Sequence, residues 1–283
     1  MQTFLASAAI SLKEYYRPEE IRQLAYSLLE DCCGFSKNEI YAGKDTKISA
    51  KQREELEQKL IRLARGEPLQ YITKLAYFYD LKLAVNPAVL IPRPETEELV
   101  EWIISDSARR KGKILDVGTG SACIALALAK HLPGMQVEAW DISPAALALA
   151  RQNAADLKLD IQLREQDLFS YSPKPGLSTY DVIVSNPPYV TTNEALRMGK
   201  RVLDHEPALA LFVPDDDPLV FYRALAALAA GILSPLGSVY VEISIYYGKE
   251  TVQLFKDAGF DEVVLRQDLS GRDRMIKASK YHG

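Results

Sequence analysis

The sequence predicts an α/β fold: a seven-stranded, mostly parallel sheet with helices on both faces, preceded by a small helical domain. Three observations support this class. From Lys113 onward, strand-like apolar runs alternate with helical patterns, as they do in parallel β-α units. Residues 1–65 instead show helical periodicity. A Gly-rich turn, Gly118–Gly120, lies between the first strand of the alternating region and its helix, as in nucleotide-type folds.

The N-terminal region is expected to form helices and then a hairpin. One helix begins at Pro18 and ends near Gly34, and Ser49–Arg65 forms another, whose leucines face a core. Aromatic and branched residues alternate from Tyr71 to Val85, which predicts a short hairpin. The expected division of the chain is a helical domain (1–70), a hairpin linker (71–90) and an α/β domain (91–283).

Seven strands are expected in the α/β domain. A helix with acidic residues in its first turn starts at Glu95, and Cys123–His131 forms the helix after the Gly-rich turn. The last two strands are close enough to form a hairpin with one antiparallel member. The expected strands are Lys113–Val117, Gln136–Trp140, Asp160–Arg164, Tyr180–Ser185, Ser238–Ile243, Glu262–Arg266 and Met275–Ala278.

The composition argues against several classes of function. The 283 residues are 48% hydrophobic and 25% charged, and no apolar run approaches the roughly 20 residues of a membrane helix. The N-terminus lacks the pattern of a secretory signal, so we expect a cytoplasmic protein without membrane contact. The three cysteines and three histidines argue against disulfides and a metal site. A net charge of −4 and a pI near 5.6 argue against non-specific binding to nucleic acid.

The loop Asn186-Pro187-Pro188-Tyr189 follows the strand Tyr180–Ser185, at the edge of the sheet where ligands bind. Its prolines stiffen the loop and donate no hydrogen bonds, which leaves an Asn amide and backbone carbonyls beside an aromatic ring. Such a loop suits a planar amide or amine group. A Pro-rich turn without a binding role is the alternative reading of these four residues.

The Gly-rich turn and two acidic residues indicate a nucleoside site. Gly118 and Gly120 permit close backbone approach, and Asp141 ends the second strand about 20 residues on, where ribose hydroxyls are bound in nucleotide-type folds. The full spacing of a dinucleotide site is absent, so a smaller nucleoside fits better. Asp116 is placed to orient a ligand ammonium group, directly or through water. Asp167, followed by Leu168 and Phe169, is placed to accept a hydrogen bond from an adenine amino group, or is an ordinary turn aspartate.

Several segments, in order, resemble the release factor glutamine methyltransferases, a family within the S-adenosylmethionine-dependent methyltransferases. The resemblance covers most of the chain and is most specific in the Pro-Arg-Pro-Glu-Thr-Glu stretch. The matching segments are Gly66–Tyr71, Leu90–Glu97, Leu115–Ser121, Asn186–Val190 and His205–Leu211.

The resemblance implies a helical substrate-recognition domain and methyl transfer from S-adenosylmethionine, with S-adenosylhomocysteine as product. It implies a glutamine acceptor in the Gly-Gly-Gln motif of peptide chain release factors, in support of translation termination. Candidate cofactor-binding residues are Gly118, Thr119, Gly120, Ser121, Ala122, Asp141, Asp167, Leu168 and Asn186. Candidate catalytic residues are Asn186, Pro187 and Tyr189, and candidate substrate-binding residues are Asn186, Pro187, Pro188 and Tyr189.

The chain departs from the family pattern at a few positions. Ala122 and Ser244 stand where glycine is frequent, and Ala122 is harmless there if its φ is negative. Leu168 replaces a bulkier aromatic residue seen in some members, and His205 stands where an aromatic residue is common.

An amide nitrogen is a poor nucleophile, so positioning is expected to dominate catalysis. The hypothesis is that the Asn186 side-chain oxygen and the Pro187 carbonyl accept the two amide hydrogens, while Tyr189 packs beside the glutamine and excludes water. Arg93 and Thr96 are candidates for closing the site, and Arg93 could equally be a structural clamp.

Two rival functions remain open at this point. A nucleic-acid amino methyltransferase would present the same loop to a base, but it needs a basic surface that the sequence does not evidently provide. A non-catalytic nucleoside-binding protein would have a damaged loop, and Asn186–Tyr189 is intact.

Overall fold

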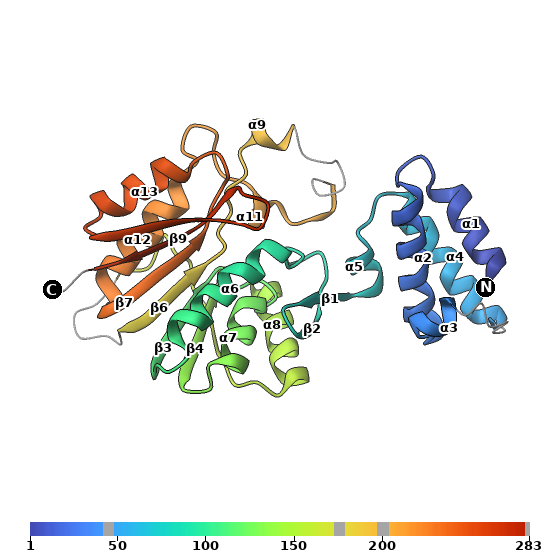
Figure 1. Ribbon diagram of the computed structural model, residues 1–283, viewed down its shortest axis with the longest axis horizontal. Helices are drawn as coiled ribbons and strands as arrows, with labels where there is room; N and C mark the ends of the chain where they lie inside the picture. The colour runs from blue at the N-terminus through green and yellow to red at the C-terminus, as the bar shows by residue number, and fades with distance from the viewer. Residues whose placement is uncertain (42–47, 173–178, 197–203, 281–283) are drawn as a thin grey trace. The chain divides into compact units, whose positions relative to one another are not determined.

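The computed structural model describes residues 1–41, 48–172, 179–196 and 204–280 (Figure 1). The chain forms two compact units, one built from Met1–Leu75 and one built from residues 76–198 and 206–283. Within the described residues, no helix is long and apolar enough to cross a membrane.

The first unit is a bundle of helices around its own core. Leu12, Leu28 and Leu56 are completely buried in that core, one from each of the three longest helices. The expected helix from Pro18 to Gly34 is confirmed, because Gly34 adopts φ 70° and ends it. The helices are α1 (Gln2–Leu12), α2 (Pro18–Cys33), α3 (Lys37–Tyr41), α4 (Ala50–Ala64) and α5 (Leu69–Thr73).

A two-stranded hairpin follows, formed by β1 (Leu75–Phe78) and β2 (Leu81–Ala84). Phe78, Leu81 and Leu83 are buried in the core of the second unit, together with residues of the helix that follows the Gly-rich turn. The hairpin therefore packs as part of the second unit.

The second unit contains the predicted seven-stranded sheet, in the order β5-β4-β3-β6-β7-β9-β8. The five strands from β5 to β7 are parallel, and β9 is antiparallel to both of its neighbours, which confirms the mostly parallel sheet. The strands are β3 (Gly112–Val117), β4 (Met135–Asp141), β5 (Gln162–Glu165), β6 (Tyr180–Ser185), β7 (Leu233–Glu242), β8 (Glu262–Gln267) and β9 (Asp273–Ser279).

One strand is longer than its sequence indicates. β7 begins at Leu233, earlier than the expected start at Ser238, and it contains Pro235 and Gly237. Its first residue pairs with Tyr180, and the register then shifts before Val182 pairs with Ser238. This irregularity accommodates a proline within the strand, because a bulge leaves positions that need no ladder hydrogen bond.

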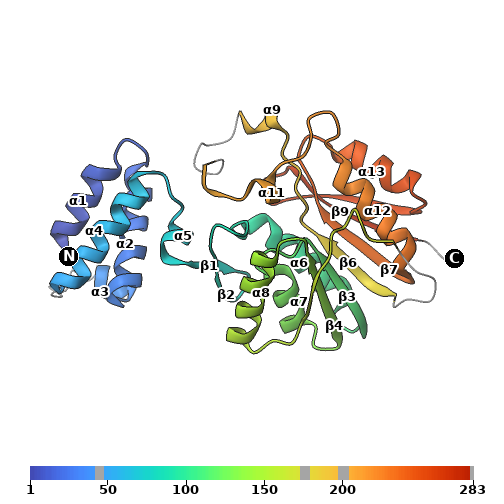
Figure 2. The ribbon, with the colours of Figure 1, turned by 180° about the vertical axis from the view of Figure 1, so that it is seen from behind.

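Helices cover both faces of the sheet (Figures 1 and 2). Successive side chains of β3 point to opposite faces of the sheet. Ile114 is buried on the face covered by α6, α7 and α8, and Leu115 is buried on the face covered by α12 and α13. The helices are α6 (Pro94–Ser107), α7 (Cys123–His131), α8 (Pro144–Leu157), α9 (Thr192–Ala195), α11 (Ala208–Leu211), α12 (Val220–Ile232) and α13 (Gly248–Asp257).

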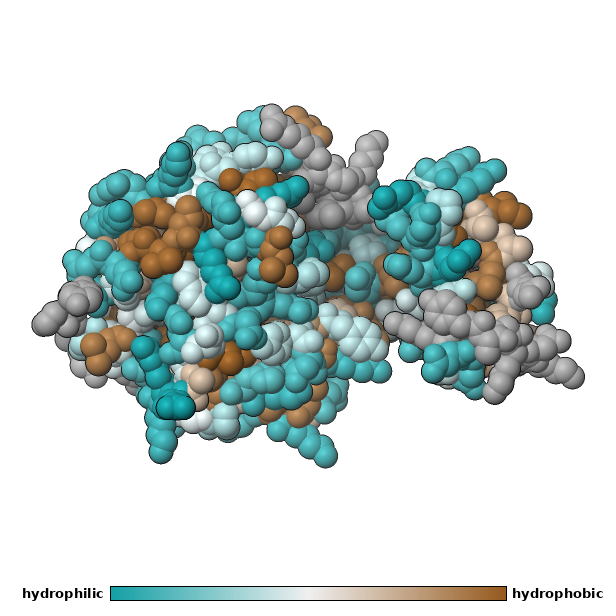
Figure 3. All heavy atoms as spheres, in the orientation of Figure 1, coloured by the Kyte–Doolittle hydropathy of each residue, from teal (hydrophilic) through white to brown (hydrophobic). Residues whose placement is uncertain are grey.

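The outer surface of the second unit is mainly hydrophilic on the face shown in Figure 3, where hydrophobic residues lie in separate patches. The most exposed large apolar side chain of the described residues is Leu269, which is 94% exposed in the turn between β8 and β9. Scattered exposure of this kind is normal for a protein surface.

Candidate active site

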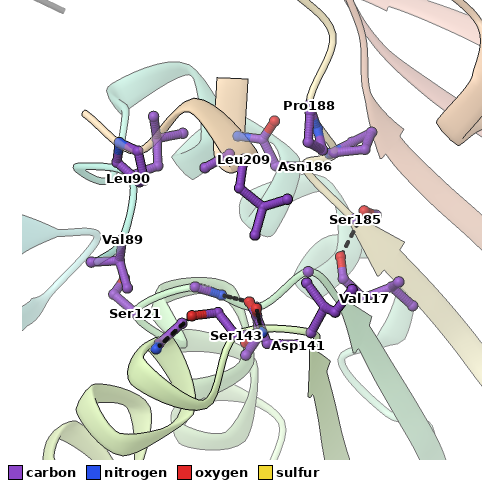
Figure 4. A pocket seen from close by; sticks show the side chains of 18 of the residues that line it. Val89, Leu90, Val117, Ser121, Asp141, Ser143, Ser185, Asn186, Pro188 and Leu209 are labelled. Carbon is purple, nitrogen blue, oxygen red and sulfur yellow. Dashed lines mark hydrogen bonds between the residues drawn. The ribbon is translucent and has the colours of Figure 1, made fainter. Parts of the chain in front are cut away.

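A cavity of about 560 Å³ lies in the second unit, at the carboxyl ends of β3, β4 and β6. The strand order reverses between β3 and β6, which is the point where open α/β sheets bind ligands. Figure 4 shows Asp141 and Ser143 on one side of the cavity and Asn186 and Pro188 on the opposite side, with Leu209 between them. A cavity of this size is typical of a site for a cofactor or small substrate.

The Gly-rich turn after β3 forms one wall, as expected. Gly118 and Gly120 have φ values of 75° and 55°, in the left-handed region that glycine tolerates. The backbone N–H groups of Gly118 and Thr119 both donate to the Trp140 carbonyl at 2.9 Å, which ties the turn to β4. A Cβ at either glycine would meet no protein atom within 4 Å, so open space is left there for a ligand.

Ala122 departs from the expectation of a harmless negative φ. It lies at the N-cap of α7 with φ 64°, in the left-handed region. An alanine in this conformation is strained because its Cβ approaches the carbonyl oxygen that follows. Its methyl group is completely buried in the core beside α7, and this packing offsets part of the strain.

Asp141 ends β4 and holds two loops together. Its Oδ2 accepts a hydrogen bond from the Gly120 N–H at 2.8 Å, and its Oδ1 accepts one from the Ser143 N–H at 2.9 Å. Burial raises the pKa of the Asp141 carboxyl, while these two backbone donors oppose the rise. A carboxylate has about four acceptor positions, so Asp141 retains capacity for ligand hydroxyl groups on the cavity wall.

Asp116 does not line the cavity. It is completely buried in β3, and its Oδ2 accepts a 2.6 Å hydrogen bond from the Thr119 hydroxyl. Its Oδ1 has no hydrogen-bond partner among the described residues. Burial raises the pKa of Asp116 to about 7. Direct contact of Asp116 with a ligand ammonium group, one of the two options expected from sequence, does not fit this placement.

The raised pKa predicts a pH-dependent stability that Asp116→Asn removes. In the folded protein the Asp116 carboxyl stays protonated up to about pH 7, whereas its ordinary pKa is 3.8. The free energy of unfolding therefore decreases as the pH rises from about 4 to about 7. The loss is at most roughly 4 kcal/mol at about 1.4 kcal/mol per pKa unit. Urea denaturation at pH 5 and pH 8 should show the variant gaining stability relative to wild type at the higher pH. An equal difference at both pH values would contradict the assignment.

The segment after β5 lines the cavity beside the end of β4, where the Gln166 N–H donates to the Asp141 carbonyl at 3.0 Å. Asp167 Oδ1 accepts a hydrogen bond from the Phe169 N–H at 3.0 Å, so the side chain shapes this turn while Asp167 and Leu168 line the cavity. The Phe169 ring packs edge-on against Phe221 of α12, with centroids 5.0 Å apart. Phe221 also lines the cavity, and no local sequence signal marks it.

The loop after β6 forms the opposite wall, and Asn186 is held in a fixed orientation. The Ser185 hydroxyl donates to the Val117 carbonyl at 2.7 Å and joins the ends of β6 and β3. Asn186 Nδ2 donates to Thr96 Oγ1 at 3.1 Å. Asn186 Oδ1 is buried without a hydrogen-bond partner among the described residues, although the residue lines the cavity.

Pro187 and Pro188 line the cavity, but Tyr189 does not. Its side chain packs against the core beneath α12, and its hydroxyl donates to Glu242 Oε1 at 3.1 Å. The expected position of Tyr189 beside a substrate glutamine therefore does not match its orientation in this structure.

Arg93 is both a cavity residue and a clamp, so the two expectations for it are not exclusive. Its guanidinium pairs with Glu206 Oε1 at 2.5 Å, and Glu206 Oε2 accepts from the Ile91 N–H at 3.2 Å. Glu206 thereby joins the loop before α6 to the segment that carries Leu209 into the cavity. Both segments matched the family pattern, but sequence reasoning gave Glu206 and Leu209 no role.

Asn153 of α8 is a second residue that sequence reasoning missed. It is 1% exposed, and its Nδ2 donates to the Ser121 carbonyl at 2.9 Å and to the Ala84 carbonyl at 3.1 Å. Its Oδ1 accepts from the Ala84 N–H at 2.7 Å. Asn153 thus joins the Gly-rich turn to the hairpin. A polar residue on the apolar face of the helix was the available signal.

One group in the described residues has ligand atoms close enough for a metal: Asp31, Cys32 and Glu55, in the first unit. The Lys59 ammonium lies 2.6 Å from Asp31 Oδ2 and 2.8 Å from Glu55 Oε1. The lysine therefore supplies the positive charge that these carboxylates need.

Two protein families and several known proteins are similar to this chain. The family described as "PrmC N-terminal domain" matches residues 3–73, and "Methyltransferase small domain" matches residues 95–209. A release factor glutamine methyltransferase of Bacteroides thetaiotaomicron is 45% identical, over 95% of this chain and 96% of the relative. The same-named protein of Flavobacterium psychrophilum is 42% identical over 95% of each chain. The chain belongs to the release factor glutamine methyltransferase family.

A solved structure supports the fold independently. The 16S rRNA N2 methyltransferase RsmC of T. thermophilus, in complex with AdoMet and guanosine, has TM-score 0.53 and 18% identity, covering 73% of this chain and 50% of that chain. The expected methyltransferase fold is confirmed. Membership of the release factor glutamine methyltransferase family confirms the expectation of an enzyme that uses S-adenosylmethionine as methyl donor. The open space at Gly118 and Gly120 and the acceptor capacity of Asp141 fit that nucleoside.

Proposed function

We propose that the enzyme methylates the side-chain amide nitrogen of the glutamine in the Gly-Gly-Gln motif of peptide chain release factors, in support of translation termination. The observation that carries the proposal is the Asn186 amide: its Nδ2 is held by Thr96, and its Oδ1 is a buried acceptor that has no partner within the described part of the chain. An unpaired buried acceptor costs about 1–3 kcal/mol, a cost that a substrate N–H would relieve.

The chemistry requires orientation more than a strong base. S-adenosylmethionine supplies an electrophilic methyl group on sulfonium sulfur. In the proposal, Asn186 Oδ1 and the Pro187 carbonyl accept the two hydrogens of the glutamine amide, which fixes its plane and favours the positive charge that develops on nitrogen. Positioning of this kind can supply up to about 7–11 kcal/mol of the barrier, so the proton can leave after methyl transfer.

The residues proposed to hold the cofactor lie on the other walls of the cavity. The turn Gly118–Ser121 provides close backbone approach, and Asp141 accepts hydrogen bonds from the ribose hydroxyls. Ala122, expected among the cofactor-binding residues, does not line the cavity because it is buried in the core. Asp167 accepts from the adenine amino group, with Leu168 and Phe169 against the base. In this arrangement Tyr189 supports Glu242 behind the wall instead of touching the glutamine.

The first unit and the charge of the chain bear on the partner of the enzyme. The helical first unit is proposed to recognise the release factor, as residues 3–73 match the "PrmC N-terminal domain". No metal, membrane or direct nucleic-acid contact is part of the proposed reaction, and the enzyme is proposed to act in the cytoplasm. The acidic balance, with net charge −4, supports a protein substrate over a nucleic acid.

A transfer assay with methyl-labelled S-adenosylmethionine tests the proposal. We expect label on a release factor and none on a release factor whose motif glutamine is replaced by alanine. Label on RNA or DNA offered in parallel would instead identify a nucleic-acid amino methyltransferase. Absence of label from every acceptor, with cofactor still bound, would identify a nucleoside-binding protein.

A further inference from the structure

Glu242 is a buried carboxylate behind the active-site wall, and neither the family motif nor the proposed reaction gives it a role. It ends β7, is 1% exposed and does not line the cavity. Thr96 of α6 donates to its Oε2 at 2.6 Å, and Tyr189 donates to its Oε1 at 3.1 Å. Burial raises the pKa of Glu242, while the nearby Arg274 guanidinium opposes the rise.

The Asn186 amide donates to Thr96, and Thr96 donates to Glu242, so both hydrogen bonds run in the same direction. A threonine hydroxyl has one hydrogen, and Thr96 gives it to Glu242. Thr96 Oγ1 therefore faces Asn186 only with lone pairs, so the Asn186 atom at 3.1 Å has to be the donor Nδ2. The opposite rotamer of the amide would place Oδ1 against Oγ1 with no hydrogen between them.

We infer that Glu242, acting through Thr96, is a positioning residue that fixes the amide of Asn186 with Oδ1 as its free acceptor. The inference rests on the proposed function, in which Oδ1 receives a substrate N–H. An amide turned the other way would present two hydrogens to a substrate that also presents hydrogens. The chain of hydrogen bonds from Asn186 through Thr96 to Glu242, called the relay below, thereby favours a methyl-accepting group that donates hydrogen bonds, such as a primary amide.

The relay predicts a specific pattern in variants at Thr96. Thr96→Val keeps the shape but removes the hydroxyl, so the Asn186 amide can turn. We expect kcat for release-factor methylation to fall about 10- to 100-fold, as misplacement of a reacting group does. The KM for the release factor and the Kd for S-adenosylmethionine should change little. Thr96→Ser keeps the hydroxyl and should restore most of kcat.

A second variant tests the carboxylate itself. The side chain of Glu242→Gln can present either its oxygen or its NH₂ group to Thr96. If the NH₂ group faces Thr96, it donates to Oγ1, and the Thr96 hydroxyl no longer donates to residue 242. We expect a fall in kcat smaller than that of Thr96→Val, again without a change in cofactor Kd. Unaltered kcat in Glu242→Gln would overturn the part assigned to Glu242.

Thr251 offers a matched control. It is a completely buried threonine in α13 whose hydroxyl donates to the Tyr247 carbonyl at 2.7 Å, outside the active site. Thr251→Val should leave kcat at the wild-type value. Equal kcat in wild type and Thr96→Val, or equal loss in Thr96→Val and Thr96→Ser, would overturn the relay. A wild-type enzyme inactive on release factors in the same assay would instead contradict the proposed function.

Discussion

Replacing Asn186 by alanine should reduce methyl transfer to a release factor by at least about 100-fold, because one preorganised group facing developing charge is typically worth 10²–10³ in rate. The substitution removes Oδ1, the buried acceptor for which the described residues provide no partner. S-adenosylmethionine should still bind, since most of its proposed contacts come from the Gly-rich turn, Asp141 and the segment after β5. Single-turnover kinetics and calorimetric titration of the cofactor measure the two effects separately.

Asn193→Ala is the matched control for this variant. Asn193 is an exposed residue of α9, in the same stretch of chain after β6. It should retain wild-type turnover. Substantial methylation by Asn186→Ala would remove Asn186 from the reaction, and a loss confined to cofactor binding would assign it to the cofactor instead.

Replacing Asp141 by alanine should raise the Kd for S-adenosylmethionine about 10- to 100-fold. A hydrogen bond to a charged group contributes about 1.5–3 kcal/mol, and tenfold in Kd corresponds to about 1.4 kcal/mol. The carboxylate also anchors the backbone of Gly120 and Ser143, so its loss loosens two loops of the cavity. Isothermal titration of wild type and variant gives the ratio directly.

An analogue of the cofactor separates the two causes. A 2′-deoxy form of S-adenosylhomocysteine should bind wild type more weakly than the parent compound but bind Asp141→Ala about equally. An equal penalty in both proteins would contradict the ribose contact. Asp156→Ala, at an exposed position of α8, should bind cofactor as wild type does.

The sheet, the helices α2, α4, α6 and α7, and the Gly-rich turn could be predicted because each has a local pattern. Cys123–His131 was predicted with both of its ends, and β6 with both of its ends, since apolar periodicity and turn residues mark them. The early start of β7 at Leu233 could not be predicted, because Pro235 and Gly237 resemble a turn until the irregular pairing with β6 is known.

The parts of the site that sequence missed depend on residues far apart in the chain. Thr96 is hydrogen-bonded to Glu242, which is 146 residues away in the sequence, and Arg93 is hydrogen-bonded to Glu206, which is 113 residues away. A local pattern contains no information on such pairs. Tyr189 shows the same limit: its place in the motif suggested contact with substrate, but its hydroxyl is directed to Glu242 instead. The positive φ of Ala122 could not be predicted either, because the neighbouring residues do not indicate it.

The most direct test of the account is tandem mass spectrometry of a release factor after incubation with the enzyme and S-adenosylmethionine. We expect one added methyl group, on the side-chain nitrogen of the Gly-Gly-Gln glutamine, and none with Asn186→Ala. An unmodified glutamine after incubation with active, cofactor-bound enzyme, or a methyl group on another residue, would contradict it.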